Sequence, residues 1–143
     1  MKAVVMAGGE GSRLRPLTSN EPKPMLSILG RPMMDHVLRL ARSHGLTEAV
    51  ATVHFLASIV RNYFGDGSNL GMGLEYAAED EPLGTAGSVR NARGMLGDRF
   101  LVLSGDALTD VDLTELIEFH RNKGAAVTVT LKRVEDPLEF GIV

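Results

Sequence analysis

The sequence lacks cysteine, long apolar runs and a large net charge, and each absence narrows the range of functions. Without cysteine among its 143 residues, the chain has no disulfide and no thiolate metal site. Its first apolar run, residues 3–7, is too short for a signal-peptide core or a membrane span. A formal net charge of -3 gives no general attraction to nucleic acid or to an anionic membrane. We therefore expect a cytoplasmic protein that binds neither nucleic acid nor membrane, and local groups must provide any phosphate binding.

Short apolar runs alternate with helical patterns along the chain. The runs predict buried strands at residues 2–6, 48–53, 74–77, 100–104 and 125–131. Apolar residues at helical spacing predict helices at residues 33–41, 56–63, 86–95 and 113–123. Thr85 is placed to cap the third helix, and Asp112 with Glu115 forms a capping box for the fourth. The alternation indicates an α/β fold, a Rossmann-like, mostly parallel sheet with helices on both faces.

The length of the chain suits one domain, so residues 1–143 are interpreted as a single nucleotide-binding unit. Its last residues, Phe140-Gly-Ile-Val143, begin an apolar run that no turn or cap closes. We expect the chain to be the N-terminal part of a longer domain. A homo-oligomer is compatible with the sequence.

A glycine-rich loop follows the first predicted strand, where open α/β sheets bind phosphate groups. It reads Gly8-Gly-Glu-Gly11-Ser-Arg13. Glycines there let backbone N–H groups approach phosphate oxygens, and an arginine adds a forked, charge-assisted contact. A Walker loop would need a glycine followed by lysine and serine or threonine, and a dinucleotide fingerprint would need a third glycine where Leu14 stands. Neither an ATPase of the Walker type nor an NAD enzyme is favoured.

Lys23 follows in the same loop region, between Pro22 and Pro24. Two flanking prolines restrict the backbone, and we expect them to hold Lys23 in an extended conformation that places its charge with little ordering cost. A cation held in that way is suited to contact an anion.

Taken together, these segments resemble the signature of the sugar-1-phosphate nucleotidyltransferases, or NDP-sugar pyrophosphorylases. The resemblance covers residues 8–18, Pro22-Lys-Pro-Met25, Pro82-Leu-Gly-Thr-Ala-Gly87 and Ser104-Gly-Asp106, and so nearly the whole chain. The overall similarity is nearest to the mannose-1-phosphate guanylyltransferases. It implies an enzyme that joins a nucleoside monophosphate to a sugar 1-phosphate and releases pyrophosphate.

The resemblance also implies roles for individual residues. Arg13 would face the leaving pyrophosphate, and Lys23 would contact the phosphates at the reaction centre. The nucleotide would be bound by Ala7, Gly8, Gly9, Gly11, Ser12, Glu79, Gly84 and Thr85. Gly141 resembles the position where the backbone meets the sugar.

Asp106 directly follows a predicted buried strand, so its carboxylate should lie at the same sheet edge as the glycine-rich loop. A carboxylate there suits Mg²⁺, which prefers hard oxygen ligands together with water and phosphate oxygens. We expect Asp106 to act as both a catalytic residue and a metal ligand. Asp112 is explained by helix capping and Asp110 by an ordinary turn.

The base preference depends on Glu79, five residues before Gly84. By resemblance, this is the position where thymidylyl- and uridylyl-transferring relatives have a glutamine that reads a pyrimidine. A carboxylate accepts hydrogen bonds without donating, which suits the adjacent N1–H and N2–H₂ donors of guanine. GTP is therefore the first choice, with mannose 1-phosphate as the second substrate. Glu81 could replace Glu79, or residues 79–81 could form a solvated acidic loop.

Other functions are compatible with the same fold. One is transfer of a thymidylyl, uridylyl or adenylyl group to glucose 1-phosphate. Another is a non-catalytic subunit that senses nucleotide sugars, although intact Arg13, Lys23 and Asp106 argue against it. A glycosyltransferase would carry an Asp-x-Asp metal motif after its strand, and Asp110-Val-Asp112 lies too late in the chain for that.

Overall fold

The computed structural model describes residues 1–136, so Gly141 and the terminal apolar run lie outside the described residues. The chain divides into two compact units, Met1–Asp110 and Val111–Val143. Among residues 1–136, no helix is both long and apolar enough to span a bilayer.

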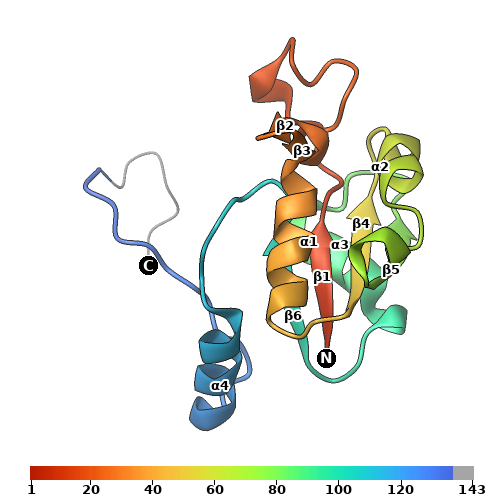
Figure 1. Ribbon diagram of the computed structural model, residues 1–143. Coiled ribbons are helices and arrows are strands. Elements are labelled where there is room, and N and C mark those ends of the chain that lie inside the picture. The colour runs from red at the N-terminus through yellow and green to blue at the C-terminus, as the bar shows by residue number, and fades with distance from the viewer. Residues whose placement is uncertain (137–143) are drawn as a thin grey trace. The chain divides into compact units, whose positions relative to one another are not determined.

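A four-stranded parallel sheet forms the centre of the first unit (Figure 1). Its strands are β1 (Lys2–Met6), β4 (Glu48–Val53), β5 (Gly73–Ala78) and β6 (Phe100–Ser104), in the order β5-β4-β1-β6. Ala3, Val4 and Val5 of β1 are fully buried, as expected for an interior strand covered on both faces. All four strands were predicted from their apolar runs, with β5 one residue longer at each end. The predicted burial of β6 was wrong, because β6 lies at the edge of the described sheet and leaves Phe100 and Val102 each 39% exposed.

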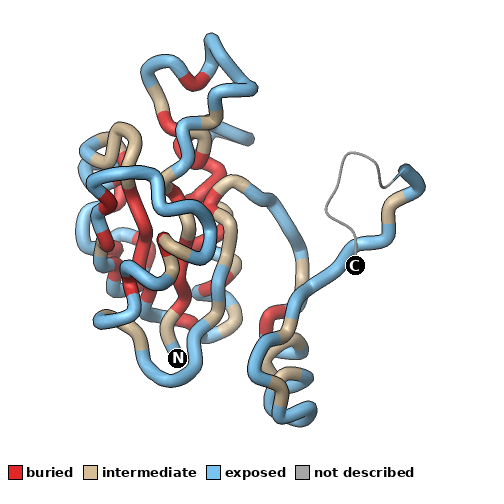
Figure 2. The backbone as a smooth tube through the Cα atoms, turned by 180° about the vertical axis from the view of Figure 1, so that it is seen from behind, coloured by how far each residue is buried: buried red, intermediate tan, exposed pale blue. Residues whose placement is uncertain are grey.

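Helices cover both faces of this sheet, which confirms the predicted α/β fold. In Figure 1, α1 (Met33–Ser43) lies in front of the sheet and α3 (Gly84–Asn91) lies behind it. The other helix of the unit is α2 (Ala57–Phe64), and the 3-10 turn η4 (Ala92–Met95) continues α3. The inward side chains of α1, Met33, Met34, Val37, Leu38 and Ala41, are buried at helical spacing. Figure 2 shows the buried residues of this unit concentrated in its interior.

One capping prediction in this unit was wrong. Thr85 does not cap α3, because the helix already begins at Gly84 and the residue before it is Leu83. The backbone enters the helix through Gly84 with a φ of +69°, a conformation that glycine adopts without a steric penalty. Thr85 therefore lies inside the first turn.

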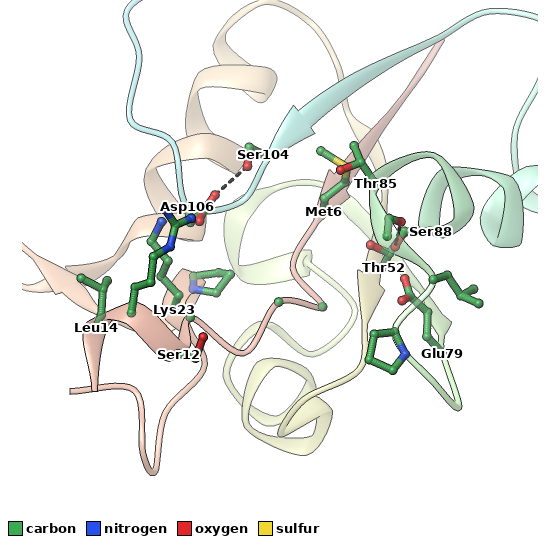
Figure 3. A pocket seen from close by; sticks show the side chains of 18 residues that line it. Met6, Ser12, Leu14, Lys23, Thr52, Glu79, Thr85, Ser88, Ser104 and Asp106 are labelled. Atoms are coloured by element: carbon green, nitrogen blue, oxygen red, sulfur yellow. Dashed lines mark hydrogen bonds and ion pairs between the residues drawn. The ribbon is translucent and has the colours of Figure 1, made fainter. Parts of the chain in front are cut away.

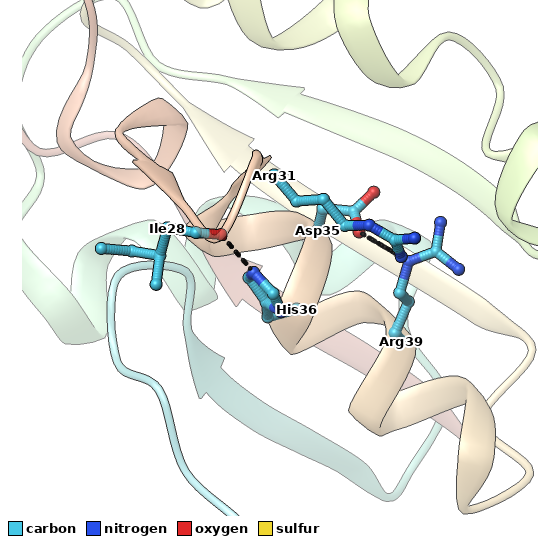
Figure 4. Close-up of polar contacts among 5 residues, drawn as sticks. All are labelled: Ile28, Arg31, Asp35, His36 and Arg39. Carbon is cyan, nitrogen blue, oxygen red and sulfur yellow. Dashed lines mark hydrogen bonds and ion pairs between the residues drawn. The ribbon is translucent and has the colours of Figure 1, made fainter.

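A short hairpin that the sequence patterns did not reveal precedes α1. It pairs β2 (Ser27–Ile28) with β3 (Arg31–Pro32), and Leu29 and Gly30 both take positive φ in the turn. Figure 4 shows how α1 holds this hairpin. His36 Nε2 lies 2.9 Å from the Ile28 carbonyl oxygen. The buried Asp35 accepts a hydrogen bond of 2.6 Å from Arg39 and also lies 3.8 Å from the guanidinium of Arg31.

The second unit contains α4 (Leu113–Lys123) and the segment after it. The predicted cap is confirmed, since Asp112 Oδ1 accepts a hydrogen bond of 2.9 Å from the Glu115 N–H. The predicted strand at residues 125–131 is wrong, because none of these residues belongs to a strand and Val127, Val129 and Leu131 are at least 66% exposed. A β-strand needs a neighbouring strand for its backbone hydrogen bonds, and the described part of this unit contains none.

Candidate functional site

A cavity of about 690 Å³ opens at the carboxyl ends of β1, β4 and β6 in the first unit. Ten of the predicted site residues line it, namely Gly8, Gly9, Gly11, Ser12, Arg13, Lys23, Glu79, Gly84, Thr85 and Asp106. Ala7 is buried, and its N–H donates to the Thr52 carbonyl oxygen at 3.0 Å, so that backbone donor is already used within the sheet. The fold therefore gathers residues from three separate parts of the sequence around one space.

The glycine-rich loop needs a glycine at residue 11 for two reasons. Its φ of +64° lies in the left-handed region, and a Cβ there would be 2.8 Å from Lys23 Cβ and 3.1 Å from Thr18 Cγ2. Thr18 also donates a hydrogen bond of 2.8 Å to the Gly11 carbonyl oxygen. Gly9 differs, since a Cβ there would have no heavy atom within 4 Å. The loop thus packs directly against the stem of Lys23 at Gly11.

The backbone around Lys23 is ordered, but in a different way from the one predicted. Pro22 is extended, whereas Lys23 begins a 3-10 turn that runs to Met25. The Met25 N–H closes this turn by donating to the Pro22 carbonyl oxygen at 2.8 Å. Pro24 and Met25 are buried, so the turn is anchored beneath the surface and the lysine side chain points into the cavity (Figure 3). The predicted extended backbone at Lys23 is therefore wrong, and a hydrogen-bonded turn orders this residue instead.

Lys23 and Asp106 meet at one end of the cavity. The Lys23 Nζ lies 2.6 Å from Asp106 Oδ2, and the Ser104 hydroxyl donates a hydrogen bond of 2.6 Å to Asp106 Oδ1 (Figure 3). The Gly105 N–H continues the β6–β1 ladder by donating to the Met6 carbonyl oxygen, where a Cβ would come within 2.8 Å of that oxygen. Gly105 thus keeps the chain close to β1 until Asp106 emerges at the sheet edge.

The surroundings of Asp106 favour its ionised form. Partial burial by itself raises the pKa of this carboxyl group, but the hydrogen bonds from Lys23 and Ser104 and the charge of Lys23 outweigh burial. The net effect is a pKa below the usual aspartate range. The side chains of Lys23 and Asp106 are 35% and 27% exposed, so a ligand in the cavity can reach both charges.

Arg13 brings a second positive charge to the cavity from the turn at Ser12–Leu14. Within residues 1–136 its guanidinium forms no ion pair, in contrast to the ammonium group of Lys23. An exposed guanidinium beside a glycine-rich loop can contact an anionic oxygen without breaking an existing pair.

Glu79 lies at the other end of the cavity and is only 8% exposed. Its N–H donates to the Val53 carbonyl oxygen at 2.9 Å, and its own carbonyl oxygen lies 2.9 Å from His54 Nδ1. The carboxylate lies beside the glycine-rich loop, since a Cβ on Gly8 would be 3.6 Å from Glu79 Oε2. Asp80 and Glu81 are exposed and outside the cavity lining. Of the three acidic residues, only Glu79 is therefore placed to face a ligand.

Sequence reasoning missed several residues that line the cavity, namely Met6, Leu14, Pro24, Thr52, Pro82, Leu83, Ser88 and Ser104. Three of them, Met6, Thr52 and Ser104, follow from the strand predictions together with the strand order. Thr52 pairs in register with Met6, and Met6 pairs with Ser104, so the three residues form a row across the carboxyl ends of neighbouring strands. Once the strand order is known, that row marks the floor of the cavity.

The sequence pattern of the nucleotidyl transferase family matches residues 2–143. The chain belongs to this family. The predicted family resemblance is thereby confirmed, and the strand-end cavity of this nucleotidyl transferase lies where open α/β sheets bind their ligands.

Curated nucleotidyl transferase relatives match the whole chain but are much longer than it. The mannose-1-phosphate guanylyltransferase of Mycobacterium tuberculosis is 44% identical over 99% of this chain and 40% of its own length. The UTP–glucose-1-phosphate uridylyltransferase of Synechocystis is 38% identical over 100% of this chain and 40% of its own length. The chain therefore spans about two fifths of the length of these relatives.

Solved nucleotidyl transferase structures share the fold. A protein from Bacillus anthracis, described as a glucose-1-phosphate thymidylyltransferase in complex with a sucrose, aligns with a TM-score of 0.80 and 27% identity. That alignment covers 85% of this chain and 50% of the other. HddC from Yersinia pseudotuberculosis, complexed with GMP-PN, aligns with a TM-score of 0.75 and 27% identity over 83% of this chain and 53% of its own.

The residues around Asp106 fit a divalent cation that arrives with a nucleotide better than a free one. Within residues 1–136, no group of three or more histidine, cysteine or acidic side chains is placed to hold a metal ion. Asp106 offers one ionised carboxylate beside a glycine-rich loop. Mg²⁺ commonly takes one or two carboxylates and fills its remaining positions with phosphate oxygens and water. The predicted metal ligand is therefore chemically suitable as a single protein contact.

Proposed function

We propose that this protein transfers a nucleoside monophosphate from an NTP to a sugar 1-phosphate and releases pyrophosphate. The observation that carries the proposal is the convergence of Gly11, Arg13, Lys23 and Asp106 on one cavity at the sheet edge. The glycine-rich loop gives backbone access to phosphate oxygens, the two cations offset their charge, and Asp106 is a hard oxygen ligand. The family and its relatives support the same reaction class.

The proposed reaction needs no general base. An oxygen of the sugar 1-phosphate is already anionic and attacks the α-phosphorus, while the bond from that phosphorus to the oxygen bridging to the β-phosphate breaks. Pyrophosphate leaves with the bonding electron pair. The barrier comes from bringing two polyanions together and from charge that develops at the α-phosphoryl group, so positioned cations supply most of the catalysis.

In this proposal each charged residue has a separate task. Lys23 contacts the α-phosphate, and Arg13 contacts the β- and γ-phosphates that leave as pyrophosphate. Asp106 would hold Mg²⁺ bound to the nucleotide, and that ion would neutralise charge on the phosphate oxygens. The contact between Lys23 and Asp106 must then be exchanged for contacts with the nucleotide and its cation. The remaining wall, which contacts the nucleotide, is lined by Gly9, Ser12, Gly84 and Thr85.

We assign GTP as the nucleotide. Glu79 supports this choice, because it lines the cavity with Oε2 near Gly8 and a carboxylate can accept from the donors of guanine. A guanylyltransferase among the relatives and the GMP-PN complex of HddC support the same base. The uridylyltransferase relative and the thymidylyltransferase-like structure keep UTP and dTTP as the alternatives.

Mannose 1-phosphate is the proposed second substrate, on the basis of the Mycobacterium tuberculosis relative. The predicted sugar contact, Gly141, lies outside the described residues, so this assignment depends on similarity alone. Because the reaction consumes an NTP, a cytoplasmic location accompanies the proposal. A homo-oligomer stays a prediction, which a measurement of the molecular mass in solution tests.

The decisive experiment measures pyrophosphate release by the complete protein with Mg²⁺ over a matrix of four NTPs and several sugar 1-phosphates. We expect the highest kcat/KM with GTP and mannose 1-phosphate. Highest activity with UTP or dTTP and glucose 1-phosphate would overturn the base and sugar assignments but keep the reaction. Nucleotide binding without pyrophosphate release would instead support a non-catalytic sensor.

A further inference from the structure

Two buried oxygen atoms in the cavity have no hydrogen-bond partner within residues 1–136. They are Thr52 Oγ1 and Glu79 Oε1, and both residues line the cavity. Buried polar atoms in folded proteins nearly always have partners, so two unpaired atoms in the same cavity need an explanation. Their chemistry is complementary, because a hydroxyl group can donate a hydrogen bond and a carboxylate can accept one.

The sheet register places the two side chains on the same face. Thr52 of β4 pairs with Ala77 of β5, and the ladder continues until the Glu79 N–H donates to the Val53 carbonyl oxygen. Side chains two residues apart on a strand share a face, so Glu79 lies on the face of Ala77 and hence of Thr52. Figure 3 shows both side chains at the end of the cavity opposite Asp106.

Burial gives the two residues different tasks. Thr52 is fully buried, so its hydroxyl cannot contact a ligand directly. Glu79 is 8% exposed and directs Oε2 towards the position of Gly8, whereas Oε1 is inaccessible. A ligand can thus meet only one side of the carboxylate, and Thr52 lies on the inner side of the cavity wall.

Neighbouring groups are already engaged. The Ser88 hydroxyl, which also lines this end, donates a hydrogen bond of 2.8 Å to the Gly84 carbonyl oxygen. His54 contacts the backbone carbonyl oxygen of Glu79 and not its carboxylate. Thr52 is therefore the buried neighbour whose hydroxyl donor is still available for Glu79.

We propose that Thr52 is a positioning residue for base selection, and that its hydroxyl donates to Glu79 Oε1 when a nucleotide base enters the cavity. This hydrogen bond orients Oε2 towards the donors of the base. The inference rests on the proposed nucleotidyltransferase function and extends it to a residue that does not touch the substrate. It also implies that the hydroxyl stabilises the nucleotide complex and contributes little to folding of the free protein.

Four variants of the complete protein test this role, with two readouts each. Thr52→Val removes the hydroxyl group and keeps the shape of the side chain, whereas Thr52→Ser keeps the hydroxyl group. Glu79→Gln and the double variant Thr52→Val/Glu79→Gln measure the coupling between the two residues. The readouts are Tm without nucleotide and Kd for Mg²⁺-bound GTP and ITP by calorimetry. ITP lacks the exocyclic amino group of guanine, so it reports on recognition of that group.

For Thr52→Val we expect an unchanged or higher Tm, about tenfold weaker GTP binding and a smaller preference for GTP over ITP. Thr52→Ser should bind GTP within about threefold of wild type, although its Tm falls because a buried methyl group is lost. The double variant should bind GTP about as weakly as Glu79→Gln alone, since the hydroxyl acts through the carboxylate.

Several outcomes would overturn the inference. Unchanged GTP affinity in Thr52→Val would do so while leaving the proposed function intact. If Thr52→Val lowers both Tm and GTP affinity and Thr52→Ser restores neither, the role of Thr52 is structural. If wild type prefers another NTP, the same variants read with that NTP decide the role of Thr52. Failure of wild type to bind any of the four NTPs would overturn the proposed function and the inference together.

Discussion

At one end of the cavity Lys23 and Asp106 pair with each other, whereas at the other end Thr52 and Glu79 each have a buried oxygen without a partner in residues 1–136. The paired charges are partly exposed and satisfied before any ligand arrives. The unpaired oxygens are buried and gain partners only when a ligand or a neighbour supplies them. Under the proposed function, phosphate binding would replace the contact between Lys23 and Asp106, whereas base binding would supply hydrogen-bond partners that Thr52 and Glu79 lack.

The largest effect is expected from removing either charge of the ion pair between Lys23 and Asp106. Lys23→Met or Asp106→Asn in the complete protein should lower kcat by about 100-fold or more. The first variant removes the positive charge proposed to contact the transferred phosphoryl group, and the second removes the negative charge proposed to hold its cation. Steady-state pyrophosphate release measures this. Lys2→Met is the matched control, since Lys2 forms an ion pair with Glu75 and does not line the cavity. Near wild-type turnover in both site variants would contradict the assigned roles.

A smaller effect is expected from adding a methyl group to the glycine-rich loop, which packs against Lys23 at Gly11. Gly11→Ala should lower the free energy of unfolding by about 1–3 kcal/mol, because the added Cβ meets Lys23 and the backbone has positive φ. Gly9→Ala should change it by less than about 1 kcal/mol, since that Cβ enters open space. Urea denaturation monitored by circular dichroism compares the two. Equal losses would show that the loop packs differently from the structure.

Nucleotide selectivity tests the end of the cavity at which Thr52 and Glu79 lie. Glu79→Gln should reduce the preference for GTP over UTP, measured as the ratio of kcat/KM values, by about tenfold, because the amide lacks the negative charge and one of its two groups is a donor that does not suit the guanine donors. Glu81→Gln is the matched control, because Glu81 carries the same charge in the acidic segment 79–81 but is exposed and does not line the cavity. We expect its selectivity to equal that of wild type. Loss of selectivity in Glu81→Gln alone would contradict the assignment of Glu79.

The smallest effect concerns the protonation of Asp106. Lys23→Met should raise the pKa of the Asp106 carboxyl group, because Lys23 supplies both a hydrogen bond and a charge that lower it. In the wild type, a lowered pKa means that the pair stabilises the fold above the ordinary aspartate pKa of about 3.9 and that this contribution is lost as the pH falls through the lower folded value. Both side chains are partly exposed, so the contribution should stay below about 1 kcal/mol. Titration of the carboxyl carbon by NMR measures the shift, and an unchanged pKa would show that the ion pair does not persist in solution.

Much of the first unit could be predicted from local patterns. The runs at residues 2–6 and 48–53 are apolar because these interior strands are covered by helices on both faces, and the periodicity of α1 reflects its single buried face. The glycine-rich loop could also be recognised, because a backbone with positive φ beside a packed lysine excludes other residues at position 11.

Errors arose where a structure depends on a partner that local patterns do not contain. Residues 125–131 have the composition of a strand but no neighbouring strand in the described part of their unit. The start of α3 depends on the conformation of Gly84 and not on the capping ability of Thr85. The β2–β3 hairpin has only two residues in each strand, and its position is set by contacts with α1.

The sequence by itself determined the family, the alternation of strands and helices, and the residue types of the glycine-rich loop, because these depend on short segments and their order. Only the tertiary structure decided that Lys23 touches Asp106, that Glu79 is buried while Glu81 is exposed, and that Thr52 and Glu79 line the same cavity. Those facts depend on strand order and register, which bring together side chains that are far apart in the chain.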